Sequence, residues 1–170
     1  MVDAHFDFVW RSLRRLGVPS SFLDDAAQQV WIVVSRRLAE IDPARERAFL
    51  FGTAIRVASD ARRAEGRRRE VLSDDAQLDA LPSERAKGAD EALDERRARA
   101  LLDDVLLAMP MELRAVFVLF ELEELSSVEI APMLGVPVGT VSSRLRRARH
   151  EFQEIVKRMR ARGALPGAPR

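Results

Sequence analysis

Apolar residues recur at the three- and four-residue spacing of α-helices along most of the chain. The first such stretch ends at Gly17, and its apolar residues are Phe6, Val9, Trp10, Leu13 and Leu16. No stretch shows a convincing alternation of apolar and polar residues with a period of two. The pattern therefore predicts an all-α protein.

Two more helices are predicted before residue 70. Ser20 or Ser21 is expected to cap the second helix, and Asp42 with Pro43 supplies a cap and a first-turn proline for the third. The apolar side of the second helix consists of Ala26, Ala27, Val30, Trp31, Val34 and Leu38. The third helix carries Phe49, Leu50, Ala54, Val57 and Ala58 and ends in a basic segment.

Residues 71–95 differ in composition from the segments on either side. They are acidic and rich in small residues, they contain Pro82 and Gly88, and they have no strong apolar stripe. Such a segment is typical of a linker. We therefore expect two small helical domains, residues 1–70 and 96–160, joined by a flexible acidic linker, with a disordered tail at 161–170.

The second domain contains a helix-turn-helix pattern. Ser126 and Glu129 have the spacing of a capping box, a short helix ends at Gly135, and Pro137 opens a long final helix. One narrow arc of that helix is apolar and must face the core: Val141, Leu145, Ala148 and Phe152. The opposite side is small and basic: Gly139, Ser143, Arg146, Arg147 and His150.

This basic side of the final helix has two possible roles. Small residues at its amino end allow close approach to a DNA groove, and the arginines beyond can hold phosphates or guanine edges. The alternative is a solvated basic face on a helical hairpin. The capped helix, the glycine turn and the polar free face together favour DNA binding.

Composition narrows the remaining classes of function. The formal net charge is only +1 over 170 residues, so any basic surface must be local. Cysteine is absent, which excludes disulfides and thiolate chemistry, and the two histidines, His5 and His150, lie at opposite ends of the chain. These counts argue against a metal site, a cofactor or a Ser-His-Asp site. The amino terminus has the features of neither a signal peptide nor a membrane span, so we expect a cytoplasmic protein.

Two segments resemble extracytoplasmic-function (ECF) sigma factors of bacterial RNA polymerase. Residues 107–149, "LAMPMELRAVFVLFELEELSSVEIAPMLGVPVGTVSSRLRRAR", resemble sigma region four at most positions of the family pattern. Residues 23–63 resemble region two more loosely. The order of the two segments, with an acidic linker between them, strengthens the identification.

The resemblance implies a non-enzymatic protein whose partners are core RNA polymerase, promoter DNA and an anti-sigma factor, with no membrane and no small-molecule substrate. It assigns minus-thirty-five DNA contacts to Gly139, Thr140, Ser142, Ser143, Arg146, Arg147, Arg149 and His150. It assigns minus-ten contacts to Arg56, Asp60, Arg62, Arg63, Arg67 and Arg68. The polymerase clamp is expected to meet Asp25, Gln28 and Gln29; the alternative for these three is a hydrated surface.

Several positions depart from the family pattern. Arg56 replaces a common asparagine, and the loop from Ala39 to Arg47 is short, which leaves the base read at the minus-ten element open. Phe49 and Phe51 could stack on bases, but their helical spacing favours the core. The rival functions are a free-standing dimeric helix-turn-helix regulator, for which no heptad seam is present, and, more remotely, an enzyme on a helical scaffold.

Overall fold

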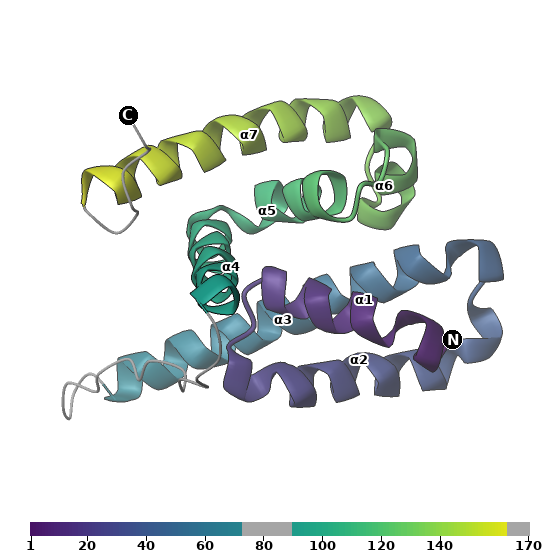
Figure 1. The fold of residues 1–170 in the computed structure, drawn as a ribbon. Helices are drawn as coiled ribbons and strands as arrows, with labels where there is room; N and C mark the ends of the chain where they lie inside the picture. Colours follow the sequence, from purple (N-terminus) through teal and green to yellow (C-terminus); the bar gives the residue numbers. More distant parts are fainter. Residues whose placement is uncertain (73–89, 163–170) are drawn as a thin grey trace.

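The computed structural model describes residues 1–72 and 90–162, with side chains at 1–67 and 97–162. Every regular element in these ranges is helical, which confirms the predicted all-α class. Three helices of the amino-terminal half form one layer, three helices of the carboxy-terminal half form a second, and α4 stands between the layers (Figure 1). None of the helices in the described ranges is long and apolar enough to cross a membrane.

The amino-terminal domain is built from α1 (Val2–Arg15), α2 (Leu23–Arg37) and α3 (Glu46–Leu72). Short 3₁₀ turns connect them: η1 (Ser20–Phe22), η2 (Leu38–Glu40) and η3 (Pro43–Arg45). The Asp42 carboxylate accepts from the Ala44 N–H at 2.9 Å, which confirms the predicted cap. The serine cap is wrong, because Ser20 and Ser21 lie inside η1 and α2 begins after Phe22 with no side-chain cap.

The core of this domain follows the predicted apolar faces except at two positions, Phe6 of α1 and Leu38. Leu38 was predicted on the apolar side of the second helix, but it begins η2 and is 54% exposed. Phe6 is 44% exposed, whereas Phe8, which the helical pattern did not include, is buried against Phe51 with ring centroids 6.2 Å apart. Phe51 is fully buried, as expected for a core residue, and Phe49 is only partly buried.

The carboxy-terminal domain contains α4 (Asp90–Ala108), α5 (Met111–Phe117), α6 (Ser127–Leu134) and α7 (Val138–Ala161). A π-helical turn, η4 (Val118–Leu122), extends α5, and the Glu123 N–H donates to the Val118 carbonyl at 3.0 Å. Helix α4 starts within the segment expected to be linker. Residues 73–89 of that segment and residues 163–170 of the tail predicted at 161–170 lie outside the described residues, and Ala161 is the last residue of α7.

The two domains pack directly on each other, with α6 and α4 against α3 and α1. At the centre of this interface Arg114 of α5 is completely buried. Its guanidinium donates to the Leu16 carbonyl at 2.5 Å, and to the carbonyls of Leu107 and Met109 at 2.6 and 2.9 Å. One side chain therefore links the end of α1 to the end of α4.

Burial and, to a smaller extent, the nearby charge of Arg62 together lower the pKa of Arg114 to about 10. The guanidinium is still charged at neutral pH. A buried charge is costly unless hydrogen bonds replace its water, and the three carbonyl oxygens supply them at Nη1 and Nη2, whereas Nε has no partner among the described residues.

Gly17 makes room for this guanidinium. Its φ is +92°, and a Cβ atom there would lie 2.5 Å from Nη1 of Arg114 and 2.9 Å from Cδ1 of Leu107. Glycine is therefore required twice over at this turn, for its backbone conformation and for the space above it.

We predict that Gly17→Ala destabilises the protein, by about 1 to 3 kcal/mol from the backbone strain alone. Gly66→Ala is the matched control, because Gly66 lies within α3 with nothing inside 4 Å of a Cβ, and alanine there should stabilise by up to about 1 kcal/mol. Urea denaturation followed by circular dichroism measures both. Equal midpoints for the two variants would contradict the packing described.

Candidate nucleic-acid interface

The helix-turn-helix is formed by α6 and α7. Ser126 Oγ accepts from the Glu129 N–H and the Glu129 carboxylate accepts from the Ser126 N–H at 2.9 Å, so the predicted capping box is confirmed. Gly135 ends α6 in the left-handed conformation, with φ 64° and ψ 35°, and Pro137 directly precedes α7. Pro132 is accommodated inside α6.

The two faces of α7 are divided as the sequence predicts. Val141, Leu145 and Ala148 are buried, and Phe152 stacks on Phe117 of α5 with centroids 4.7 Å apart. The residues predicted to meet the minus-thirty-five element are exposed apart from Thr140, which is half-buried: Gly139, Ser142, Ser143, Arg146, Arg147, Arg149 and His150. The Ser142 and Ser143 hydroxyls donate to carbonyls within α7, which leaves their oxygens free to accept.

Three of the predicted residues line one shallow hollow on this face. Arg146, Arg147 and His150 surround a depression of about 420 Å³ together with Pro110 and Leu113 of the neighbouring turn and α5. Within the described residues neither Arg146 nor Arg147 forms an ion pair, so both guanidiniums are available to an outside anion. Sequence analysis missed the part played by Pro110 and Leu113, which come from another element.

Two other arginines of α7 form ion pairs with residues of neighbouring elements. Arg149 donates to the Glu121 carboxylate at 2.7 Å and lies over the Phe120 ring. Arg144 pairs with Glu112 at 3.4 Å on the side that faces the amino-terminal domain. Of these four arginines of α7, Arg146 and Arg147 are thus on the outward face, and Arg144 and Arg149 are paired with carboxylates of the same chain.

The residues predicted to meet the minus-ten element all lie on α3, and four of them share one side of the helix through their three- and four-residue spacing. Arg56, Asp60, Arg63 and Arg67 are exposed, and Asp60 accepts from Arg63 at 2.6 Å. Arg62 is half-buried near Arg114. Arg68 lies on α3, but its side chain is outside the described residues. The helix therefore aligns four of the six predicted residues in one exposed row, and the half-buried Arg62 lies outside it.

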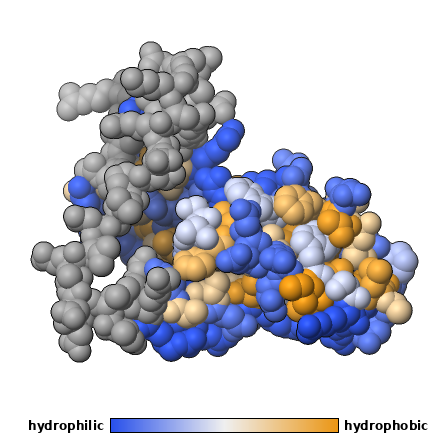
Figure 2. Space-filling model, turned by 90° about the horizontal axis from the view of Figure 1, so that it is seen from below, coloured by the Kyte–Doolittle hydropathy of each residue, from blue (hydrophilic) through white to orange (hydrophobic). Residues whose placement is uncertain are grey.

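A groove between α2 and α3 brings together residues from two of the predicted sets. Asp25 and Gln29 of α2 face Arg56 and Asp60 of α3 across a space of about 690 Å³. Its other lining residues are mostly apolar: Phe22, Ala26, Val33, Val57, Ala61 and Ala64. Gln28 is exposed but does not line the groove. The underside of the molecule, where α2 lies, presents apolar patches among hydrophilic ones (Figure 2).

A second cleft, of about 750 Å³, lies between the domains. Arg56 lines it too, beside Phe49 and the short loop predicted to border the minus-ten pocket, and the opposite wall is α5, the end of α6 and Arg144. A Cβ on Gly52 of α3 would lie 3.8 Å from the Met133 carbonyl of α6. The carboxy-terminal domain therefore covers part of the face that the sequence assigned to minus-ten DNA.

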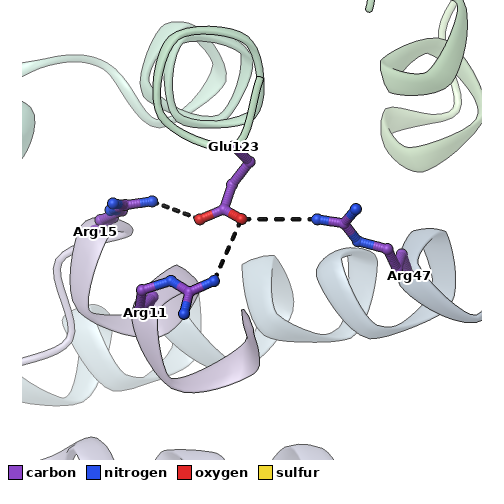
Figure 3. A network of polar contacts seen from close by, with 4 residues as sticks. All are labelled: Arg11, Arg15, Arg47 and Glu123. Carbon is purple, nitrogen blue, oxygen red and sulfur yellow. Dashed lines mark hydrogen bonds and ion pairs between the residues drawn. The ribbon is translucent and has the colours of Figure 1, made fainter. Parts of the chain in front are cut away.

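Sequence analysis did not anticipate an ionic network between the domains. Glu123, at the end of η4, points toward Arg11 and Arg15 of α1 and Arg47 of α3 (Figure 3). Its side chain is only 7% exposed. Arg14 of α1 makes a second ionic link, to Asp103 of α4 at 2.7 Å. These residues are far apart in the sequence, so no local motif reveals the network.

The geometry defines an all-helical protein of two domains with an exposed helix-turn-helix, and family comparisons agree with both halves. Residues 1–68 match the model for Sigma-70 region 2, and residues 96–151 match that for Sigma-70, region 4. The chain belongs to the sigma-70 family, within its extracytoplasmic-function group. The resemblance predicted from the sequence is confirmed.

Named relatives share both regions. The chain is 32% identical over 157 residues to the ECF RNA polymerase sigma factor SigE of Mycolicibacterium smegmatis, covering 92% of this chain and 60% of that protein. It is 27% identical over 150 residues to the ECF RNA polymerase sigma-E factor of Escherichia coli, covering 82% and 76% of the two chains. The chain thus spans less than two thirds of the SigE relative.

Two solved structures share the fold. CnrH, in a complex with the cytosolic domain of CnrY, superposes with a TM-score of 0.66 at 23% identity, over 92% of this chain and 84% of CnrH. The sigma factor RpoE, in a complex with the anti-sigma factor NepR from Bartonella quintana, gives 0.62 at 21% identity, over 92% and 98% of the two chains.

We predict that Ser126→Ala destabilises the helix-turn-helix by about 1 kcal/mol, because an N-cap hydroxyl is lost. The hydrogen bonds from Ser126 lower the pKa of Glu129 below its usual 4.5, so the ionised carboxylate stabilises the folded state. That contribution is complete above pH 4.5 and is lost as the pH falls through the lowered pKa. The difference between the two proteins should therefore shrink in acid.

Thermal denaturation across this pH range tests the assignment. Ser127→Ala is the control, because Ser127 is the first residue of α6 and is not the cap. A pH-independent difference between the parent and Ser126→Ala would show that the Glu129 half of the box is unimportant.

Proposed function

We propose that this chain is a sigma factor: it binds core RNA polymerase and directs promoter-specific initiation of transcription. Its helix-turn-helix reads the minus-thirty-five element, and its amino-terminal domain opens the minus-ten element. The observation that carries the proposal is the exposed face of α7, where Arg146 and Arg147 have no ion pair within the described residues, on a chain that also contains a region-two domain. Free guanidiniums beside small residues suit groove and phosphate contacts.

The polymerase-binding surface proposed here is the exposed side of α2. Asp25, Gln28 and Gln29 are all exposed there, next to the apolar groove between α2 and α3. A polar rim around an apolar centre is the usual anatomy of a protein interface. In this function the protein carries no catalytic activity of its own and acts in the cytoplasm with the polymerase.

An anti-sigma factor is proposed as a further partner. The structural neighbour RpoE was solved in a complex with an anti-sigma factor, and CnrH in a complex with a cytosolic domain of CnrY. Both share this fold over more than nine tenths of the chain. A protein inhibitor that holds the two domains away from polymerase is consistent with that likeness.

At the minus-ten element, Arg56 is proposed to act chiefly through its charge. It is exposed and lies at the rim of both the α2/α3 groove and the interdomain cleft. Arginine offers only donors, whereas the asparagine common at this position offers a donor and an acceptor to a base. A phosphate contact in place of a base contact relaxes selectivity at that position.

The function is tested by run-off transcription with purified core RNA polymerase and promoter-bearing DNA. The parent should give a discrete transcript, and Asp25→Arg with Gln28→Arg should abolish it by placing two cations on the polymerase-binding surface. The same double variant should keep its affinity for minus-thirty-five DNA. A chain that binds promoter DNA but neither binds core polymerase nor supports a transcript would instead be a free-standing regulator.

The recognition helix gives a sharper prediction. Arg146→Ala should cost about 1 to 3 kcal/mol of promoter affinity at one base position, because Arg146 points away from the core toward a base edge. Arg147→Ala should weaken all sequences alike and lower the salt slope by about one, as expected for a phosphate contact. Arg149→Ala should have a smaller effect, because its guanidinium is held by Glu121.

Fluorescence anisotropy with matched and mutated minus-thirty-five duplexes measures these effects. Arg158→Ala is the control, since Arg158 lies farther along the same helix and pairs with Glu151. Equal losses for Arg146→Ala and Arg158→Ala would count against the proposed reading face.

A further inference from the structure

Three arginines of the amino-terminal domain converge on a single carboxylate of the carboxy-terminal domain (Figure 3). Arg15 Nη1 lies 2.5 Å from one oxygen of Glu123. Arg11 and Arg47 each lie 3.6 Å from the other oxygen. Three positive charges therefore surround one almost buried carboxylate, and the only other carboxylate that the described residues place in electrostatic contact with Arg47 is the exposed Glu129.

The Glu123 carboxylate accepts a hydrogen bond from Arg15 but none from Arg11 or Arg47. A distance of 3.6 Å is an ion pair and too long for a hydrogen bond, so Arg11 and Arg47 contribute charge without donating. Arg47 is also held in place by the Phe8 ring, 4.5 Å below its guanidinium. The cluster is thus positioned for an anion with more charge or more widely spaced oxygens than one carboxylate.

Backbone phosphate has those properties. The planar fork of arginine donors fits phosphate oxygens, and clusters of arginine are a common device for binding them. We propose that Arg11, Arg15 and Arg47 form a binding site for a backbone phosphate of DNA, and that Glu123 occupies this site as an internal substitute while the two domains are packed together. This inference rests on the proposed function, because a promoter-binding protein meets DNA as its anionic partner.

Glu123 and a DNA phosphate cannot occupy the arginine cluster at the same time. Glu123 belongs to the carboxy-terminal domain, and the same domain lays α6 across α3 beside the cluster. Arg11 and Arg47 are nearly half exposed, but a phosphate can take the place of the Glu123 carboxylate between all three arginines only after that domain moves away. The movement that withdraws Glu123 from the arginine cluster therefore also exposes the covered face of α3. DNA that binds the cluster stabilises the arrangement in which the two domains are separated.

Other contacts also hold the domains together, so removal of Glu123 weakens the packing without abolishing it. Arg114 bonds to the Leu16 carbonyl, and Arg14 pairs with Asp103, both independently of the cluster. Truncating one partner of a largely buried ionic network is nevertheless costly to the arrangement that contains it. The population of separated domains should rise in Glu123→Gln.

The first experiment measures binding of a short single-stranded oligonucleotide of mixed sequence by fluorescence anisotropy, without polymerase. Glu123→Gln should bind several-fold more tightly than the parent, and its salt slope should steepen by about 0.7 for each phosphate newly neutralised. Glu124→Gln is the matched control, because the neighbouring glutamate is exposed and has the same charge. Equal gains in the two variants would reduce the effect to net charge and overturn the proposal.

The second experiment separates the arginine cluster from other surfaces uncovered by domain movement. Arg11→Gln, Arg15→Gln and Arg47→Gln are combined with Glu123→Gln, so that the buried carboxylate is never left unpaired. This quadruple variant should lose the gained affinity. If the gain persists, the DNA binds another face, such as α3, and the proposed site is wrong.

Domain separation is followed by resonance energy transfer between dyes at Asp7→Cys and Gln153→Cys, two exposed positions on α1 and α7 of a chain without native cysteine. The oligonucleotide should lower transfer in the parent, and inorganic phosphate at the same phosphate concentration should not. Separation driven by inorganic phosphate alone would identify a free-anion site instead. Because polymerase is absent throughout, an inactive run-off assay would leave this result unchanged.

Discussion

A single buried guanidinium holds the two halves of this protein together. Arg114 comes from α5, yet one of its three carbonyl acceptors, Leu16, belongs to the turn after α1. That turn can approach only because Gly17 has no side chain and adopts a positive φ. Once Arg114 and Gly17 are in place, α6 is set against α3 and Glu123 against the arginines of α1. The packing of the domains therefore depends on a contact to backbone oxygen at its centre and on side-chain charges at its edge.

The packing of the domains leaves one proposed DNA surface exposed and partly covers the other. The outward face of α7 is free, so the minus-thirty-five element could be read without any change in the chain. The face of α3 beside Phe49 and Gly52 is partly covered by α6. The α2 surface proposed for polymerase lies on a different side of the same domain. If polymerase binding at α2 is to separate the domains, its effect must be transmitted through the three-helix core of the amino-terminal domain.

Local features of this structure could be predicted from the sequence, and long-range features could not. The Asp42 cap, the capping box at Ser126 and Glu129, and the apolar arc of α7 all depend on residues within a few positions of one another. The serine cap failed because Pro19 started a 3₁₀ turn that took Ser20 and Ser21 inside it. Phe8 replaced Phe6 in the core because tertiary packing, rather than helical spacing alone, chose the buried side of α1.

The site residues illustrate the same division. Exposure of Arg146 and Arg147 follows from helical geometry, whereas the engagement of Arg149 by Glu121 depends on a helix 28 positions earlier. The Glu123 network joins three separate segments, and nothing in the local sequence marks it. Charge balance over the chain also conceals it, because arginines and carboxylates that pair between domains cancel in the formal net charge of +1.

The π-helical turn at Val118–Leu122 sets the direction in which Glu123 points. A π-helical turn contains one residue more than the α-helical turn it replaces, and each residue rotates a helix by about 100°. If the same residues formed an ordinary α-helix instead, Glu123 would rotate by about 100° away from its arginines, while every side chain of both domains remained. The conformation of a single turn therefore aims Glu123 at the amino-terminal domain, independently of the surfaces proposed to recognise DNA or polymerase.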